Sequence, residues 1–258
     1  MLLTVCIDNS FISCGAFDGD RLRFVTSMAT LPRRTADQYA VELESLLRLH
    51  GALPTDFGEA ALASVVPELI PIFSEAIQTL TGCAALVLGP GVKTGLNILI
   101  ENPAQLGGDL VAAAVAAAAR FPLPCVLFDF GSVTTVSVLD KNGSYRGAII
   151  SAGVGLTLDA LTSHTALLPH IGIGSPPSVI GKNSVQSMQS GVIFGTAAML
   201  DGLAERIEAE LKSAVHIVAS GQFAEAILPH CRRKAELCEH LPLHGLRIIF
   251  AKNHAIAV

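Results

Sequence analysis

The sequence predicts an α/β protein built from two similar lobes. Two observations support this prediction: strand-like apolar segments alternate with helical ones along 258 residues, and a strand–aspartate–turn–strand unit occurs twice, around Asp8 and around Asp129. The chain is long enough to bury two modest cores. Similarity between halves of this length indicates a duplicated domain rather than a solenoid. We therefore expect lobes at 1–122 and 123–258 with a cleft between them.

The first half is expected to open with three strands, at 2–8, 12–17 and 21–28. The turn Asp18-Gly19 joins the last two, since this pair is typical of hairpins. Thr35 is expected to begin a helix, because Gln38 stands three residues later and completes a capping box.

Two further strands and two further helices complete the first half. Short runs of small apolar residues predict buried strands at 60–66 and 84–89. Pro67 is expected to open the helix between them, because proline is tolerated in a first helical turn. An alanine-rich helix is expected at 109–121, and the segment FPLP (121–124) then predicts a linker.

The second half repeats this plan. After Asp129 come a polar turn, a second strand, a turn at Gly143 that matches Gly19, and a third strand. A long helix is expected at 184–212 from an apolar stripe at helical spacing. In this helix Gly191 and Gly195 would allow another helix to approach closely, either within the chain or across a subunit contact.

Composition excludes several classes of partner. The net charge is −5 and the Lys and Arg residues are scattered, whereas nucleic-acid binding requires a sustained basic face. The longest apolar run, 110–119, is shorter than the roughly 20 residues that span a bilayer. No charged-then-apolar leader opens the chain and the six cysteines form no CxxC pair, so we expect a cytoplasmic protein with reduced thiols and no membrane or nucleic-acid partner.

The paired aspartates carry the main chemical signal. A carboxylate at the carboxyl end of a strand can bind a metal ion, and the turn that follows can donate N–H groups to phosphate oxygens. Asp8 and Asp129 stand at matching places in the two halves, so a nucleoside triphosphate held from both sides is one interpretation. The alternative is that each aspartate only caps a turn.

Asp109 is the third candidate acid. It follows Gly107 and Gly108 and stands at the start of a predicted helix, where the helix dipole favours an acid. It could equally act as a general base, with the glycines allowing substrate to approach the backbone. The residues by themselves leave both interpretations open.

One long block resembles a known family. The run DFGSVTTVSVLDKNGSYRGAIISAG, which starts at Asp129, is similar to the central block of type III pantothenate kinases. Further blocks similar to that family follow the same order along nearly the whole chain: SVVP (64–67), GPGVKTGL (89–96), NPAQLGGD (102–109), GKNSVQSMQSG (181–191) and LPLHGLRIIFAKN (241–253).

The resemblance implies a fold and an activity. The fold would be the duplicated ribonuclease-H-like fold of the acetate and sugar kinase and actin superfamily, assembled as a homodimer. The activity would be transfer of the ATP γ-phosphoryl group to the terminal hydroxyl of pantothenate, the first step of coenzyme A biosynthesis.

The resemblance also implies roles for individual residues. Asp109 would be the base, Asp129 would bind a monovalent cation, usually K⁺, and Asp8, Asn9 and Ser10 would face the ATP phosphates with Mg²⁺. Ser132 would also contact ATP. The pantothenate site would include Gly107, Gly108, Asp109 and Leu110, with Ser184 reaching it across the dimer.

This chain also departs from the family pattern. The first loop, usually D.GNT, reads Asp8-Asn9-Ser10-Phe11-Ile12 here, and Leu110 replaces an arginine expected to bind the substrate carboxylate. Loss of one charge-assisted hydrogen bond costs about 1.5–3 kcal/mol. Two alternatives to the kinase therefore stand beside it: a catalytically impaired paralogue that binds or regulates, and a kinase whose acceptor lacks a carboxylate.

Overall fold

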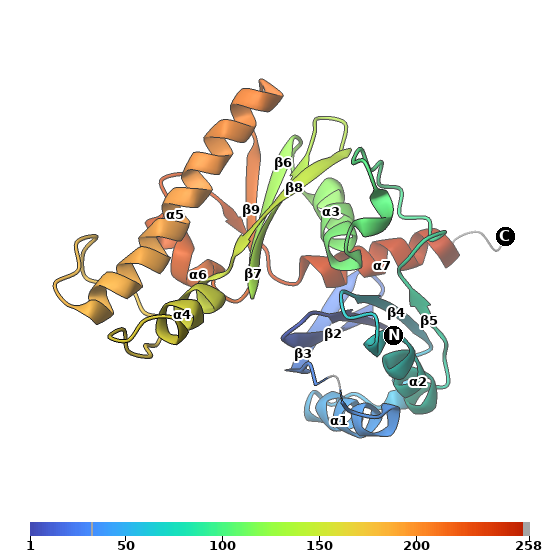
Figure 1. Ribbon diagram of the computed structural model, residues 1–258. Helices are drawn as coiled ribbons and strands as arrows, with labels where there is room; N and C mark the ends of the chain where they lie inside the picture. Colours follow the sequence, from blue (N-terminus) through green and yellow to red (C-terminus); the bar gives the residue numbers. More distant parts are fainter. Residues whose placement is uncertain (32, 255–258) are drawn as a thin grey trace. The chain divides into compact units, whose positions relative to one another are not determined.

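The computed structural model describes residues 1–31 and 33–254, which divide into two compact units (Figure 1). Unit 1 contains residues 1–96, 101–119 and the chain from 241 onward. Unit 2 contains residues 97–100 and 120–240. The two units are described separately below.

Unit 1 is built on a five-stranded mixed sheet in the order β3-β2-β1-β4-β5. The strands β1, β2 and β3 form an antiparallel meander, whereas β4 and β5 run parallel to β1. Parallel neighbours need crossover connections, and helices supply them here. The strands span Leu2–Ile7, Phe11–Asp18, Arg21–Ala29, Glu59–Ser64 and Ala85–Val87.

Helices cover both faces of this sheet. Helices α1 (Ala36–Leu49) and α2 (Leu69–Thr81) pack on the face that carries Leu3, Val5 and Ile7. Helices α3 (Gly108–Arg120) and α7 (Leu241–His254) share the core of the opposite face, which contains Leu2 and Cys6. Short 3₁₀ turns lie at Pro54–Asp56 (η1) and Pro103–Gln105 (η2).

Two predicted helix starts in unit 1 have different outcomes. The capping box at Thr35 is confirmed: its Oγ1 accepts a hydrogen bond from Gln38 N at 3.3 Å, and Gln38 Oε1 accepts one from Thr35 N at 3.0 Å. The prediction that Pro67 opens α2 is wrong by two residues. Pro67 lies in the turn before Leu69, and its carbonyl accepts a bond from Ile70 N at 3.2 Å.

Unit 2 repeats the sheet of unit 1. Its order, β10-β9-β6-β7-β8, becomes the order of unit 1 when read from β8, and each pairing has the same sense. The turns at Gly19 and Gly143 both have positive φ, as expected for matching hairpins. The duplicated ribonuclease-H-like fold is thus confirmed. The strands span Cys125–Phe130 (β6), Val133–Leu139 (β7), Tyr145–Ala152 (β8), His216–Ser220 (β9) and Glu236–Leu237 (β10).

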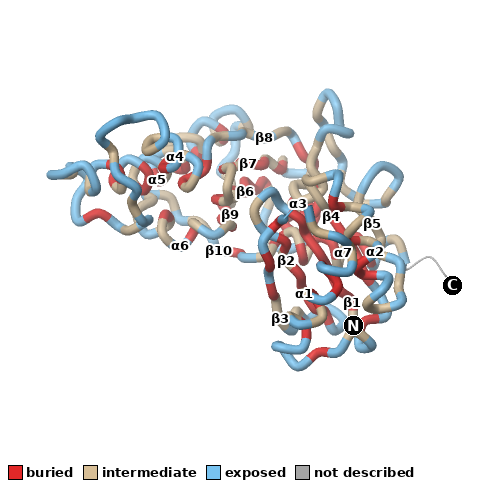
Figure 2. The backbone as a smooth tube through the Cα atoms, turned by 60° about the horizontal axis from the view of Figure 1, so that its bottom comes forward, coloured by how far each residue is buried: buried red, intermediate tan, exposed pale blue. Residues whose placement is uncertain are grey.

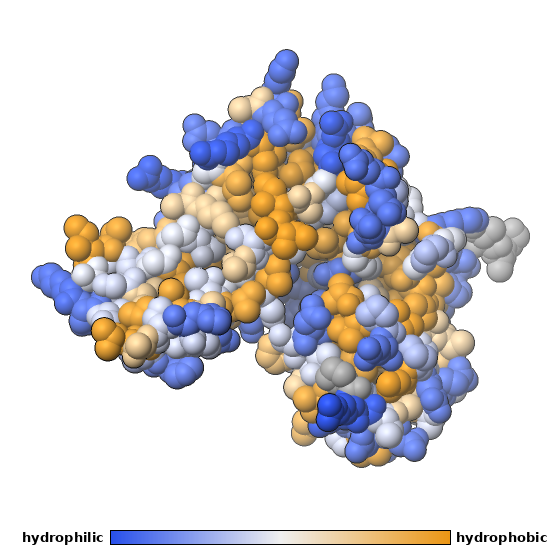
Figure 3. Space-filling model, viewed as in Figure 1, coloured by the Kyte–Doolittle hydropathy of each residue, from blue (hydrophilic) through white to orange (hydrophobic). Residues whose placement is uncertain are grey.

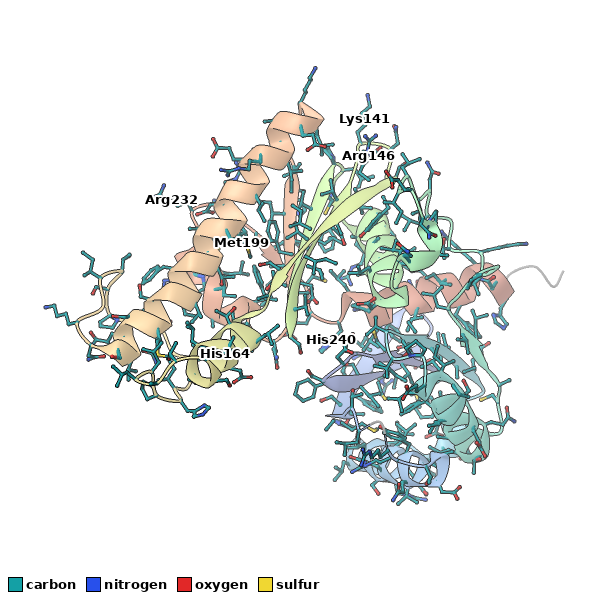
Figure 4. All side chains as sticks on the ribbon, in the orientation of Figure 1. Lys141, Arg146, His164, Met199, Arg232 and His240 are labelled. Atoms are coloured by element: carbon teal, nitrogen blue, oxygen red, sulfur yellow. The ribbon has the colours of Figure 1, made fainter. Side chains whose placement is uncertain are left out.

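Helix α5 (Ser184–Leu211) forms most of the helical layer of unit 2, with α4 (Val154–Ser163), α6 (Ala224–Ile227) and the 3₁₀ turn η3 (Leu228–His230). The predicted apolar stripe of α5 is buried with residues of β6 and β9 in one core. Met199, which also packs on this core, is labelled in Figure 4. Gly191 and Gly195 are exposed, and a Cβ added to either would meet nothing within 4 Å, so packing inside the described chain does not require these glycines.

The C-terminal segment differs from the predicted domain boundary. Residues from 241 onward were expected in the second lobe (123–258), but α7 packs in unit 1. The contact is so close that a Cβ added to Gly245 would lie 1.8 Å from Ala112 O. The apolar side chains of α7 complete the core under β1, so the chain returns to its first unit. Residues 255–258 of the predicted lobe lie outside the described part.

Buried residues are concentrated in the strands, whereas the outward faces of the helices are exposed (Figure 2). Among the described residues, none of the helices combines the length and apolar character needed to cross a bilayer.

Candidate active site

The carboxyl edge of the unit 1 sheet gathers several candidate residues. Ile7 and Ser64 are paired at the ends of the parallel strands β1 and β4, and Val65 N donates to Ile7 O at 3.0 Å. Leu88, just after β5, donates its N–H to Leu62 O at 2.7 Å. In α/β proteins, ligands bind in crevices outside such carboxyl ends. This edge is therefore where a substrate is expected.

The loop Asp8–Phe11 connects β1 to β2 at this edge. Asp8 N donates to Phe11 O at 2.9 Å, which makes the loop tight. Thr30 holds it from outside: Thr30 Oγ1 donates to Asp8 O at 2.7 Å, and Thr30 N donates to Ser10 O at 2.9 Å. Asp8 and Asn9 are exposed, and Ser10 is half-buried. Thr30 was missed by the sequence analysis, because its role depends on β3 returning beside this loop.

Asp109 lies beside the same edge, in the first turn of α3. A Cβ added to Gly107 would lie 2.3 Å from Asp109 Oδ1 and 3.3 Å from Val65 Cγ1. A Cβ added to Gly108 would lie 3.5 Å from Ala63 Cβ, which is in ordinary contact. A side chain at position 107 would therefore displace the Asp109 carboxylate from this position.

The surroundings of Asp109 suit a base. Its Oδ1 is buried and has no hydrogen-bond partner among the described residues. Burial raises the pKa of this carboxyl group, although the backbone amides of Leu110 and Asp109 oppose the shift. A helix-capping role leaves Oδ1 unexplained. A buried carboxylate oxygen with an open acceptor position and a raised pKa is instead typical of a functional group.

Asp129 lies in unit 2, near the end of β6. Its Oδ1 accepts a hydrogen bond from Ser220 Oγ at 2.9 Å. Gly221 has φ +90°, and a Cβ added to it would lie 2.7 Å from Asp129 Oδ1. A Cβ added to Gly131 would lie 3.4 Å from Asp129 Oδ2. Two glycines therefore flank the carboxylate, and the Ser220 hydroxyl binds its Oδ1. Ser220 was missed as a site residue, although its segment ASG belongs to the similar blocks.

The loop after β6 carries Ser132. A Cβ added to Gly153 would lie 2.3 Å from Ser132 O and 2.5 Å from Gly131 O, so the loop packs directly on the start of α4. Ser132 is half-buried in this loop. Asp129 and Ser220 thus form a bonded pair at the carboxyl edge of the unit 2 sheet, and Ser132 lies in the loop that follows β6.

Asp129 and Ser220 offer oxygen atoms to a cation. The described residues contain no group of three or more His, Cys, Asp or Glu arranged to hold a metal ion. The donors beside Asp129 are oxygen atoms, which hard cations such as K⁺ and Mg²⁺ prefer. A side chain at Gly131 or Gly221 would occupy the space beside the Asp129 carboxylate. This space would suit a cation whose other ligands are backbone oxygens and water.

Asp8 and Asp129 do not occupy equivalent positions, which corrects the sequence-based expectation. Leu3, Val5 and Ile7 of β1 face the core under α1 and α2, just as Val126, Phe128 and Phe130 of β6 face the core under α5 and α6. Both strands have six residues, and aligning them end to end puts these two sets on the same face and matches Asp129 with Cys6.

The strand registers give the same answer. Asp129 pairs with Ser220 between β6 and β9, and Cys6 pairs with Ala63 between β1 and β4. Asp8 lies two residues beyond Cys6, after the strand has ended. Asp129 is thus the second-last residue of β6, whereas Asp8 follows the end of β1, so a match based on the polar turn after each aspartate paired the wrong residues.

The remaining predicted residues occupy two places. Leu110 follows Asp109 in α3, is half-buried and brings no charge to this edge. Ser184 is the exposed first residue of α5, directly after the N-cap Asn183, whose Oδ1 accepts from Gln186 N at 2.9 Å.

A surface hollow of about 480 Å³ between α1 and α2 contains none of the predicted residues.

Comparison with known proteins agrees with the resemblance. The sequence profile described as type III pantothenate kinase matches residues 2–206. A type III pantothenate kinase of Anaeromyxobacter sp. (strain K) is 38% identical over 253 residues, covering 98% of this chain and 100% of that protein. The type III pantothenate kinase of Shouchella clausii is 36% identical over 255 residues, with the same two coverages.

Solved structures show the same fold at low identity. Component A of the (R)-2-hydroxyglutaryl-CoA dehydratase of Acidaminococcus fermentans superposes with a TM-score of 0.59 at 14% identity, covering 98% of both chains. The activator of the 2-hydroxyisocaproyl-CoA dehydratase of Clostridium difficile, solved with bound ADPNP, gives a TM-score of 0.52 at 12% identity and covers 100% of this chain and 97% of that one.

Proposed function

This chain belongs to the type III pantothenate kinase family, and on that premise we propose that it transfers the γ-phosphoryl group of ATP to the terminal hydroxyl of pantothenate. That reaction is the first step of coenzyme A biosynthesis. We place the reaction in the cytoplasm.

The observation that carries this proposal is the carboxylate of Asp109. Its buried Oδ1 has no protein partner among the described residues, and its pKa is raised by burial. An acceptor hydroxyl could donate a hydrogen bond to this oxygen and then transfer its proton to it. Phosphoryl transfer otherwise depends on positioning and electrostatics, so one well-placed base and two substrate loops suffice.

We assign the other residues by their loops. Asp8, Asn9 and Ser10 would contact the ATP phosphates together with Mg²⁺, and Ser132 would also contact ATP. Asp129 would hold K⁺, with Ser220 orienting its carboxylate. Bound cations would neutralise phosphate charge. Pantothenate would lie against Gly107, Gly108, Asp109 and Leu110.

The direct test is a phosphorylation assay with ATP, Mg²⁺, K⁺ and pantothenate. We expect phosphopantothenate to form, and to form more slowly when Na⁺ replaces K⁺. A true kinase of the family serves as the positive control. Absence of turnover at high enzyme concentration would contradict the proposal. Calorimetry would then identify the impaired paralogue if ATP still binds, and neutral hydroxyl acceptors would test the third alternative.

We also propose that the protein forms a homodimer through the outer face of α5. Gly191 and Gly195 are exposed there with open space around them, and Ser184 stands on the same face by helical spacing. Unit 2 also exposes large apolar side chains, including Ile150 on β8 and Leu167 and Ile180 in the segment before α5. Figure 3 shows part of this hydrophobic surface of unit 2.

Sedimentation velocity tests the homodimer. Gly191→Leu should convert a dimer to a monomer, because the larger side chain would prevent close helix contact. Gly58→Leu, at an exposed loop glycine of unit 1 with nothing within 4 Å, is the matched control and should remain dimeric. A wild-type protein that sediments as a monomer would refute this assembly.

A further inference from the structure

The glycine-rich loop 89–96 begins next to the proposed base. It follows β5 at the carboxyl edge of the unit 1 sheet, and Leu88, just before it, would lie 3.7 Å from a Cβ added to Gly108. Gly91 and Gly95 have φ of +90° and +73°, values that side chains disfavour. A loop with this composition loses much conformational entropy when it is ordered, so it needs contacts from outside to keep one shape.

Asn253 in the last turn of α7 supplies such contacts. Its Oδ1 accepts a hydrogen bond from Lys93 N at 3.1 Å, and its Nδ2 donates one to Lys93 O at 3.0 Å. The same Nδ2 donates to Ile249 O at 2.8 Å, which anchors the amide to its own helix. Asn253 therefore binds both backbone groups of one loop residue, as a neighbouring strand would do.

Lys252 adds a second point of attachment. Its Nζ donates to Thr94 O at 3.0 Å. A Cβ added to Gly95 would lie 2.3 Å from this Nζ, so the loop passes directly under the lysine head group. Three consecutive loop residues, 93–95, are thus contacted by two consecutive helix residues.

Helix α7 also contacts the helix of the base. Gly245 lies against the backbone of Ala112, one turn after Asp109 in α3. The loop side chains Val92 and Leu96 pack on the core that α3 and α7 share. A single rigid helix therefore touches α3 at one end and loop 89–96 at the other, and it sets the distance between Asp109 and the loop.

We propose that Asn253 and Lys252 are positioning residues for the acceptor substrate, acting by holding loop 89–96 beside Asp109. This inference rests on the proposed function, because it takes the acceptor hydroxyl to be bound at Asp109. Neither residue touches the reacting atoms. A loop released from α7 would sample several shapes, and only a fraction of them would bind the acceptor.

Steady-state kinetics of the full-length protein test this inference. Asn253→Ala should raise the KM for pantothenate about tenfold, the equivalent of one to two net hydrogen bonds. It should leave kcat and the KM for ATP within about twofold of wild type. The reason is that the variant loses acceptor binding equally in the ground state and in the transition state. Asn253→Asp keeps the oxygen that accepts from Lys93 N, so its KM for pantothenate should lie between those of wild type and Asn253→Ala. Lys252→Met should also raise the KM for pantothenate, but by less than Asn253→Ala does. Lys252→Arg should keep the wild-type KM.

His254→Ala is the matched control. His254 lies in the same turn, but its Nδ1 and ring contact Phe250 of its own helix. We expect its kinetics to match wild type. An unchanged KM for pantothenate in Asn253→Ala, or equal changes in both KM values, would overturn the positioning role.

Amide exchange separates this proposal from the proposed function. In Asn253→Ala the amide of Lys93 should lose protection while the strands keep theirs, whatever the enzyme does. If wild type phosphorylates no pantothenate, the proposed function fails. If wild type is active and Lys93 stays protected in the variant, the role of α7 fails instead.

Discussion

At the scale of single residues, Asp109 combines a functional advantage with a cost to stability. Its carboxylate is mostly buried, and Oδ1 has no partner in the described chain. Burial disfavours the charged form and raises the pKa, which makes the carboxylate a better proton acceptor. The same burial means that the ionised side chain opposes folding.

Replacement of the base should separate activity from stability. Asp109→Asn should lower kcat by about 10²–10⁴-fold, the usual contribution of a general base. The variant should also unfold at a higher urea concentration than wild type at neutral pH, because it buries no charge. In the unfolding measurement alone, Gly108→Ala, which has room for a methyl group, serves as a control for local packing. Retained activity in Asp109→Asn would show that another group is the base.

The pH dependence follows from the same pKa. Because the folded pKa of Asp109 lies above its unfolded value, the folded state binds more protons in the window between them. The contribution of Asp109 to stability therefore falls as pH rises through that window. The stability difference between Asp109→Asn and wild type should disappear below the ordinary pKa of aspartate. In the same window kcat of wild type should rise with pH, as the base loses its proton.

At the scale of elements, α7 depends on one glycine. Gly245 has no room for a side chain, because an added Cβ would lie 1.8 Å from Ala112 O and 2.4 Å from Ala112 C. The obstacle is backbone, which cannot move aside as a flexible side chain can. The helix pair α3–α7 therefore requires glycine at this position.

The expected effect is a large loss of stability from one methyl group. Gly245→Ala should lower the free energy of unfolding by about 1–3 kcal/mol or more, in spite of the better helix propensity of alanine. Gly202→Ala in α5, where the nearest atom is the end of the Arg206 side chain, should be neutral or stabilising. Urea unfolding of both variants measures the contrast. Equal stability of the two would show that α7 can shift away from α3.

At the scale of the whole molecule, the two units share a fold but differ in chemistry. Unit 2 presents the Asp129–Ser220 pair at the end of its central strands, and unit 1 presents Cys6 and Ala63 in the equivalent places. Cys6 and Ala63 are both buried in the core shared by α3 and α7. Unit 1 thus lacks a carboxylate at this position, and Asp8 is displaced beyond the strand end.

Transfer of the polar pair from unit 2 to unit 1 tests the meaning of this difference. Cys6→Asp combined with Ala63→Ser should tighten the binding of ATP with Mg²⁺ about tenfold, the order expected of a charge-assisted contact. Calorimetric titration measures the affinity, and Cys6→Ser is the uncharged control. An unchanged affinity in a folded variant would mean that the end of β1 does not contact the nucleotide–metal complex.

Local patterns in the sequence predicted much of this structure. Alternation of apolar segments, the capping box at Thr35 and the matching turns at Gly19 and Gly143 correctly predicted the strands around these turns, helix α1 and the duplication. These signals are local, because hydrogen bonds and turn geometry between near neighbours produce them. The resemblance to the kinase family was also a local signal, because it was carried by consecutive residues that start at Asp129.

Three other points became visible in the tertiary structure. It matched Asp129 with Cys6 rather than Asp8, it returned α7 to unit 1, and it placed Asn253 on loop 89–96. Each depends on contacts between residues far apart in the chain: strand register, the face of a sheet and close packing of backbones. Spacing along the sequence cannot report such contacts, because the sheet decides where β1 ends and which of its residues pair with β4.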